Sequence, residues 1–548
     1  MRPCYPRSAP LMKTSLRDDV LICGAIALVA SLALVALASV YPLRHFYVAD
    51  NHIMSNDQVG YITTARWLAE TGELRSHLIY PAFVREPTWR NYMPGNYYVL
   101  AAGELLFGPG PVAWRIPAMA SFIVAAVGVF LIGRRFYGRV EGVVAALLFI
   151  LFPPLTAFAF TAMPQLPFIA AGVTAFAVLA LLPARARPWL VPALLVVPFL
   201  FRETGALLLI PMGLVVLGDR HRRRWSTPVA VVLSSTAFLY AVLQWQRALG
   251  KGSRPLHIFG ALNYDNAYLP PSPPLTLARV AEGLGTNVSS NISALGAHLD
   301  RLDPAHVSLV VVAALAALAL AKGTRRDSSG NRDLLALGAG VLFFVAAAVL
   351  TTLYTWEYYR GMRAMLFTVP LIAVSLAPWL VTALRRLRRH TEGRLPHPFG
   401  LLPGLLLLGA LLAGAYRGGR AYARGFDPTA GRRAVELLES LDLDHHGILV
   451  APFDVSLDYV LRHYPLRWSF VPRNTRTLRL LAETYPVQTV IMRKDELRGR
   501  RPAYEKALRD IGLVRRREIP HPFRDHVTLV LFQGRQPQGR SHASPLGR

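Results

Sequence analysis

Asp57 lies at the edge of a long apolar segment, where a carboxylate can do chemistry. It follows the first apolar run and opens a half-polar stretch, Asp57–Thr71, that has helical patterning. A carboxylate in this place can take the proton from an attacking hydroxyl group, which is the task of a general base. A helix N-cap is the other interpretation, because Asp often accepts hydrogen bonds from the first backbone N–H groups of a helix. Tyr61 lies four residues further on the same helical face. Its side chain can either contact the substrate or pack against the protein.

Three arginines lie beside other apolar runs. Arg202 separates two such runs, and Arg360 and Arg363 precede a third. An ionisable side chain at this depth costs about 2.5–3.5 kcal/mol on insertion scales, and a guanidinium group binds phosphate through two parallel hydrogen bonds. The three together predict a phosphate-binding pocket. The alternative is snorkelling to lipid headgroups or ion pairing with the neighbouring Glu203 and Glu357.

Arg85 and Arg90 add positive charge to the same loop as Asp57, with Glu86 between them. They can reach a lipid or substrate headgroup, or they can simply be solvated. We retain both as candidate substrate-binding residues.

Cofactor chemistry finds little support in the sequence. His445 and His446 follow Asp442 and Asp444 closely, but their spacing is not that of a metal site. The chain has no Walker-type phosphate loop and no Gly-x-Ser-x-Gly turn. We therefore predict that the protein needs no cofactor, and the sequence argues against an ATP-driven pump.

The elements that must position these side chains are membrane helices. The 548 residues are 53% hydrophobic and only 17% charged, against about 25% charged in soluble proteins. Apolar runs of roughly 18 or more residues recur, and each is long enough to cross a bilayer. The net charge of +27 is carried mostly by arginines in short loops between these runs, as the positive-inside rule requires. Nucleic-acid binding is not indicated.

The fold class predicted is an all-α polytopic membrane domain with a small C-terminal α/β domain. We expect about eleven spans, near residues 20–40, 113–133, 140–158, 164–182, 188–201, 204–218, 227–246, 306–322, 333–354, 363–384 and 399–417. Residues 1–19 form a cytoplasmic N-terminus, 20–417 the membrane domain with an external loop at 41–112, 418–533 the α/β domain, and 534–548 a disordered tail.

Charge predicts the orientation of the chain. If the N-terminus is cytoplasmic, five arginine-rich loops fall inside, and the odd span count places the C-terminal domain outside. The protein is then a multi-pass plasma-membrane protein.

Residues 97–107 are apolar but too short to span, which predicts an interfacial helix. In the C-terminal part, strands are expected at 448–452, 468–471, 487–492 and 528–532, and helices at 454–463, 475–483 and 502–511.

Several short motifs follow one another in the order of one superfamily of membrane enzymes. The motifs are Asn56–Leu74, Tyr92–Gly108 with Arg115, Arg134–Arg139, Arg202-Glu203-Thr204, and Arg363 with Pro370. Over about residues 15–390 this order resembles the GT-C superfamily of membrane glycosyltransferases. The closest likeness is to glycosyltransferase family 39, the protein-mannosyltransferase and aminoarabinose-transferase branch.

The resemblance implies a function. Such enzymes take a sugar from a polyprenyl-phosphate donor and carry a catalytic Asp in the first external loop, the position that Asp57 matches. A lipid, glycan or protein would be the acceptor. Gln58, Met93 and Gln165 depart from the family pattern, in which the corresponding residues are often acidic or, for Met93, a lysine. These departures keep open a catalytically inactive scaffold subunit as an alternative, beside a lipid or polysaccharide transporter.

Overall fold

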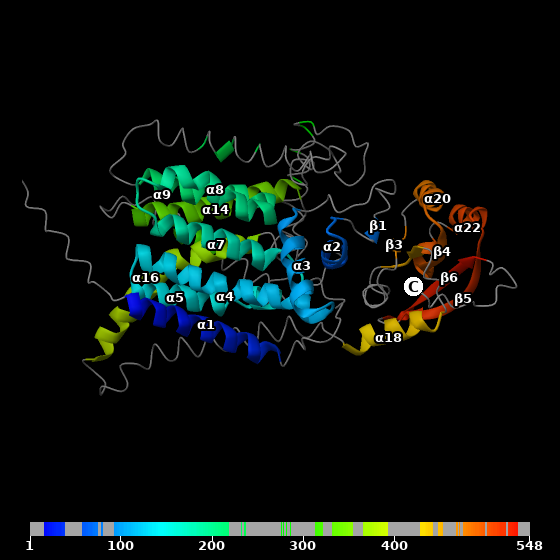
Figure 1. The fold of residues 1–548 in the computed structure, drawn as a ribbon, viewed down its shortest axis with the longest axis horizontal. Coiled ribbons are helices and arrows are strands. Elements are labelled where there is room, and N and C mark those ends of the chain that lie inside the picture. The colour runs from blue at the N-terminus through cyan, green and yellow to red at the C-terminus, as the bar shows by residue number, and fades with distance from the viewer. Residues whose placement is uncertain are drawn as a thin grey trace, which may run out of the picture.

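A computed structural model describes most of the predicted elements of the chain. It describes residues 16–38, 57–74, 78–79, 93–218, 313–319, 331–353, 365–392, 428–441, 448–452, 467–469, 475–498, 501–521 and 524–534, with isolated positions between them. A bundle of roughly parallel helices occupies one side of the molecule, and a sheet domain occupies the other (Figure 1). Two shorter helices, α2 and α3, lie between them.

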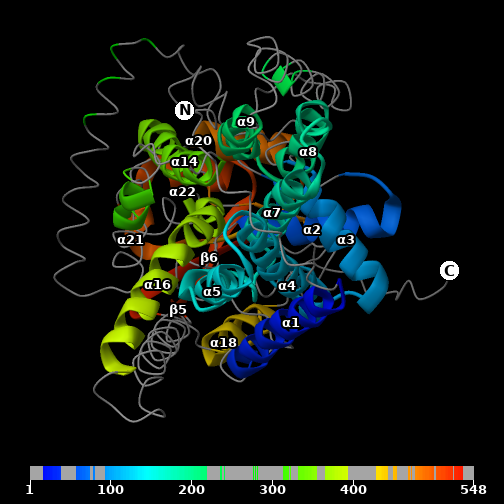
Figure 2. The same cartoon turned by 90° about the vertical axis from the view of Figure 1, so that its left-hand side faces the viewer.

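The bundle is built from apolar helices seen end-on in Figure 2. Its described elements are α1 (Leu16–Ala38), α4 (Pro111–Phe136), α5 (Arg139–Ile150), α6 (Pro153–Phe158), α7 (Gln165–Leu181), α8 (Arg187–Phe201), η3 (Glu203–Leu208), α9 (Leu209–Leu217), α14 (Asn331–Leu353), η4 (Leu366–Thr368) and α16 (Val369–Glu392). Among the residues that the structure describes, three stretches are long and apolar enough to cross a membrane: Arg17–Ala36, Pro111–Phe136 and Leu366–Arg386.

The prediction of about eleven spans is not confirmed as a count. The expected spans at 227–246 and 306–322 are described only in part, and 399–417 lies outside the described residues. The expected span at 140–158 is two helices, α5 and α6. The physical reason is the pair Pro153-Pro154, because proline lacks the N–H group that would continue α5 and restricts the residue before it.

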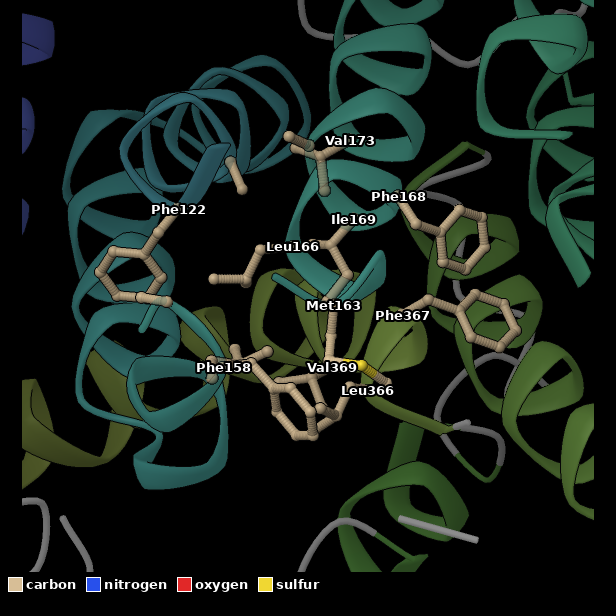
Figure 3. Close-up of a cluster of buried hydrophobic side chains, with 14 of the residues drawn as sticks. Phe122, Phe158, Met163, Leu166, Phe168, Ile169, Val173, Leu366, Phe367 and Val369 are labelled. Carbon is tan, nitrogen blue, oxygen red and sulfur yellow. The ribbon is translucent and has the colours of Figure 1, made fainter. Parts of the chain in front are cut away.

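Small residues let the bundle helices approach closely. A Cβ atom added at Gly142 of α5 would lie 2.8 Å from the backbone oxygen of Phe130 in α4, so this crossing requires glycine. Near the middle of α4, aromatic and aliphatic side chains gather between the helices (Figure 3). Phe122 stacks on Phe149 with ring centroids 5.4 Å apart. Together these contacts form one continuous apolar core.

Ion pairs gather at the end of the bundle where α1 begins. Asp19 is buried and pairs with both Arg134 and Arg139, and Asp18 also contacts Arg139. The loop between α4 and α5, whose ends carry these arginines, was expected to share one membrane face with the N-terminus. The structure places both arginines beside the start of α1.

Asp19→Asn should destabilise the protein more than Asp18→Asn. Asp19 is 5% exposed and holds two guanidinium groups, whereas half of the Asp18 side chain is exposed. Loss of the buried carboxylate leaves two guanidinium groups without this partner and should lower the free energy of unfolding by about 1–3 kcal/mol. The loss is no larger because both arginines stay partly solvated. Thermal unfolding in detergent micelles, followed by tryptophan fluorescence, measures the difference. Equal effects of the two variants would contradict this account of the cluster.

Two helices outside the bundle lie at its opposite end: α2 (Asp57–Thr71) and α3 (Gly95–Phe107). The last turn of α3 exposes Leu105, Leu106 and Phe107. This apolar surface fits the predicted interfacial helix, whose side chains contact lipid while its other face packs on protein.

Five strands of the C-terminal part and β1 (Leu78–Ile79) form a six-stranded mixed sheet in the order β1-β3-β2-β4-β6-β5. The elements of the C-terminal part are α18 (Pro428–Glu439), β2 (Ile448–Val450), β3 (Arg467–Ser469), α20 (Thr475–Thr484), β4 (Val487–Arg493), α21 (Lys494–Arg498), α22 (Arg501–Asp510), β5 (Leu513–His521) and β6 (Arg524–Gly534). The four predicted strands and two of the three predicted helices are present. The helix expected at 454–463 lies outside the described residues.

One strand of this sheet comes from the first loop. β1 (Leu78–Ile79) pairs in parallel with β3, with Leu78 opposite Trp468. The C-terminal domain therefore lies on the same side of the bundle as α2 and α3.

Candidate functional site

The candidate site begins where α2 meets the loop between α6 and α7. Asp57 is the first residue of α2. Its neighbour Gln58 is buried, and its Oε1 accepts a hydrogen bond from the backbone N–H of Ala162 at 2.9 Å. The first turn of α2, and with it Asp57, is therefore fixed against this loop.

Two more buried side chains hold the same loop from other helices. Asn96, at the start of α3, donates from Nδ2 to the backbone oxygen of Ala162 at 3.0 Å. Arg115, in the first turns of α4, donates from Nε to the backbone oxygen of Phe160 at 3.1 Å. Side chains from α2, α3 and α4 thus position the loop between α6 and α7. They also satisfy its buried backbone groups, which require hydrogen-bond partners. The sequence analysis did not single out Asn96, because an isolated Asn carries no pattern.

Arg202 reaches the same end of the bundle through the turn between α8 and η3. Its backbone is extended, its N–H donates to Pro198 and its oxygen accepts from Gly205. A Cβ atom at Gly205 would lie 2.7 Å from the backbone nitrogen of Phe199, so this tight reversal requires glycine. The Arg202 side chain is partly exposed.

Helix α3 connects the two halves of the site. A Cβ atom added at Gly95 would lie 2.8 Å from the backbone oxygen of Leu200, two residues before Arg202. The next residue, Asn96, binds Ala162, which also binds Gln58. The structure therefore brings the start of α2, the start of α3, the loop at Ala162 and the turn at Arg202 to one end of the bundle.

The remaining predicted site residues divide into two groups. Tyr61 is buried and packs on Tyr97 of α3, with ring centroids 5.3 Å apart, so it anchors α2 to α3. The other four candidates lie outside the described residues: Arg85, Arg90, Arg360 and Arg363. Within the described ranges, no three His, Cys, Asp or Glu side chains are placed to share a metal ion.

An apolar cleft lies deeper in the bundle, between α7, η3 and the start of α16. Its walls include Phe168, Gly172, Leu208, Phe367 and Pro370. Such walls suit a hydrocarbon chain and offer nothing to a charged group.

Glu104 is a buried carboxylate at the far end of α3. It accepts a hydrogen bond from Nε1 of Trp114. Burial raises the pKa of the Glu104 carboxyl above its usual range, and the Trp114 hydrogen bond opposes this rise in part.

This raised pKa predicts a pH-dependent stability. The folded protein binds the Glu104 proton more tightly than the unfolded chain does, so the free energy of unfolding falls as pH rises from the unfolded pKa to the folded pKa. Above that window the stability stays at its lower value. Glu104→Gln keeps an acceptor for Trp114 and should flatten this part of the curve. Unfolding temperatures in micelles between about pH 4 and pH 8 test it, and an unchanged slope in the variant would contradict it.

Comparison with known proteins finds a family model that matches part of the chain and solved structures with a similar fold. The family model described as dolichyl-phosphate-mannose-protein mannosyltransferase matches residues 91–245. No curated protein matches the chain significantly in sequence.

Two solved structures share the fold over most of the chain. One is ArnT from Cupriavidus metallidurans bound to undecaprenyl phosphate: 16% identity, 94% of this chain and 98% of that chain covered, and a TM-score of 0.51. Another is the archaeal oligosaccharyltransferase AglB from Archaeoglobus fulgidus with an inhibitory peptide and a dolichol phosphate: 11% identity, 87% and 70% covered, and a TM-score of 0.50. The resemblance of this chain to GT-C membrane glycosyltransferases is thereby confirmed, by the family match over residues 91–245 and by the fold.

Proposed function

We propose that this protein is an integral membrane glycosyltransferase that moves a sugar from a polyprenyl-phosphate donor to an acceptor, with inversion. The reaction takes place at the extracytoplasmic face of the plasma membrane, the N-terminus being cytoplasmic. One observation carries the proposal. The start of α2, where Asp57 lies, and the turn that holds Arg202 lie at the same end of the bundle, linked through Asn96 and Ala162.

The sidedness rests on the two ends of the bundle. Arg134 at the end of α4 and Arg139 at the start of α5 pair with Asp18 and Asp19 near the start of α1, and positive loops face the cytoplasm. The candidate site, α3 with its exposed apolar turn, and the C-terminal sheet lie at the opposite end. In this arrangement the C-terminal domain covers the acceptor side of the site.

The proposed reaction is one displacement. The acceptor hydroxyl oxygen attacks the anomeric carbon opposite the phosphate, Asp57 takes the hydroxyl proton, and the bond between carbon and phosphate oxygen breaks. The phosphate leaves with the electron pair, held by Arg202, Arg360 and Arg363. Arg85 and Arg90 contact the headgroup from the first loop. No nucleotide is needed, because the sugar arrives already activated.

Two solved structures with this fold support a lipid-phosphate donor. ArnT was solved with undecaprenyl phosphate, and AglB with a dolichol phosphate and an inhibitory peptide. The apolar walls of the cleft beside α7 match the chemistry of an isoprenoid chain.

The test is turnover of labelled polyprenyl-phosphate sugars by the protein in nanodiscs, with lipid, glycan and peptide acceptors. We expect a glycosylated product whose anomeric configuration, measured by NMR, is opposite to that of the donor. A retained configuration would overturn the mechanism. Donor binding without turnover would favour a scaffold subunit, and movement of intact donor between leaflets would favour a transporter.

A further inference from the structure

Two amide side chains beside Ala162 carry hydrogen-bonding atoms that no group of the described structure satisfies. Gln165, the first residue of α7, is 2% exposed, and neither its Oε1 nor its Nε2 has a partner. Asn96 is fully buried and donates to Ala162, but its Oδ1 has no partner. Leaving a buried polar group unpaired costs folding free energy, so such atoms point to a ligand.

Gln165 lies on the helical face that lines the apolar cleft. Phe168, Ile169 and Gly172 follow it by three, four and seven residues and form part of the cleft wall, which is the spacing of one side of a helix. Gln165 is thus the polar end of an otherwise apolar surface. That end is also where Asn96 and Gln58 hold Ala162.

The chemistry of the unpaired atoms selects a ligand class. Gln165 offers two N–H donors and an acceptor, and Asn96 offers an acceptor. A neighbouring pair of hydroxyl groups can donate to one oxygen and accept from one N–H group at the same time. An ammonium group can only donate, and a carboxylate can only accept, so each leaves part of this set unpaired.

We infer that Gln165 and Asn96 bind the hydroxyl groups of the transferred sugar, and that this sugar is neutral. The inference rests on the proposed function, because it assigns these amides to the sugar of the polyprenyl-phosphate donor. Gln58 and Asn96, which hold Ala162, and Gln165, three residues after it, are all uncharged amides. None of the three offers a carboxylate to a cationic amino sugar, and the carboxylate of Asp57, next to Gln58, is assigned to the proton of the acceptor hydroxyl.

The test compares donors with the polyprenyl phosphate that lacks the sugar. Affinities are measured for the full chain in nanodiscs, with a neutral hexose donor, an amino-sugar donor, a uronic-acid donor and sugar-free polyprenyl phosphate. Wild type should bind the neutral donor at least about tenfold more tightly than the amino-sugar and uronic-acid donors, since each charged group leaves a buried hydrogen-bonding atom unpaired. This comparison needs no variant, so it stands even if a substitution prevents folding.

Gln165→Leu should weaken the neutral donor about tenfold and leave sugar-free polyprenyl phosphate unchanged. Gln488→Leu is the matched control, because Gln488 in β4 also has a buried Oε1 without a partner but lies in the C-terminal sheet. It should change neither affinity. Gln165→Glu supplies a carboxylate and should shift the preference toward the amino-sugar donor.

The possible failures are distinguishable. If no polyprenyl-phosphate ligand binds, both the proposed function and this inference are wrong. If donors bind but wild type prefers a charged sugar, or if Gln165→Leu weakens sugar-free polyprenyl phosphate equally, this inference is overturned and the function stands. Unchanged affinities in Gln165→Leu would mean that only water satisfies the amide, which also overturns it.

Discussion

Replacing Asp57 with Asn should lower sugar transfer by about 10²–10⁴-fold, the range that a positioned general base contributes. The amide has nearly the same shape but accepts a proton far more weakly. Donor affinity should stay close to that of wild type, because the phosphate is held by arginines in this proposal. The measurement is single-turnover transfer from a labelled donor in nanodiscs, with donor binding measured in parallel.

Glu70→Gln is the matched control for this experiment. Glu70 lies on the same helix, α2, and pairs with Arg66 on its exposed side, away from the turn that contacts Ala162. Its transfer rate should equal that of wild type. Transfer at wild-type rates by Asp57→Asn would show that Asp57 is only a helix cap, and parallel losses in rate and in unfolding temperature would assign it to stability.

Several apolar helices of the bundle could be placed from the sequence, because a bilayer demands long apolar runs. The expected span at 333–354 agrees with α14, Asn331–Leu353, to within a few residues. The expected span at 140–158 failed because apolar content was read without the break at Pro153-Pro154. In the C-terminal domain, the strand expected at 487–492 matches β4 because it is a short apolar run between turn residues.

The contacts that assemble the site could not be read in the same way. β1 has two residues, Leu78 and Ile79, and pairs with a strand from the far end of the chain. Such a short segment has no measurable alternation, and its partner is set by tertiary packing. Asn96 was likewise missed, since its role depends on the backbone oxygen of Ala162 lying within reach. Gln58 was read as a departure from a family pattern, and the structure shows that it holds a backbone N–H group.

Arg202→Gln should weaken donor binding by roughly 10- to 100-fold, because one or more charge-assisted hydrogen bonds to phosphate are each worth about 1.5–3 kcal/mol. Sugar-free polyprenyl phosphate should lose affinity to the same extent, since the lost contact is to phosphate and not to the sugar. Arg202→Lys keeps the charge but cannot form two parallel hydrogen bonds, so its affinity should lie between those of wild type and Arg202→Gln.

The position of Arg202 makes this result specific. Its backbone hydrogen bonds to Pro198 and Gly205 do not depend on the side chain, so the turn should survive the substitution. Arg385→Gln is the control, because Arg385 pairs with Glu141 and is more than half exposed; it belongs to one of the arginine-rich loops predicted to be cytoplasmic. If both variants weaken the donor equally, the effect is one of overall charge. If Arg202→Gln binds the donor as wild type does, the phosphate site must be built from other residues, and Arg202 is left with the role of a lipid-facing cation.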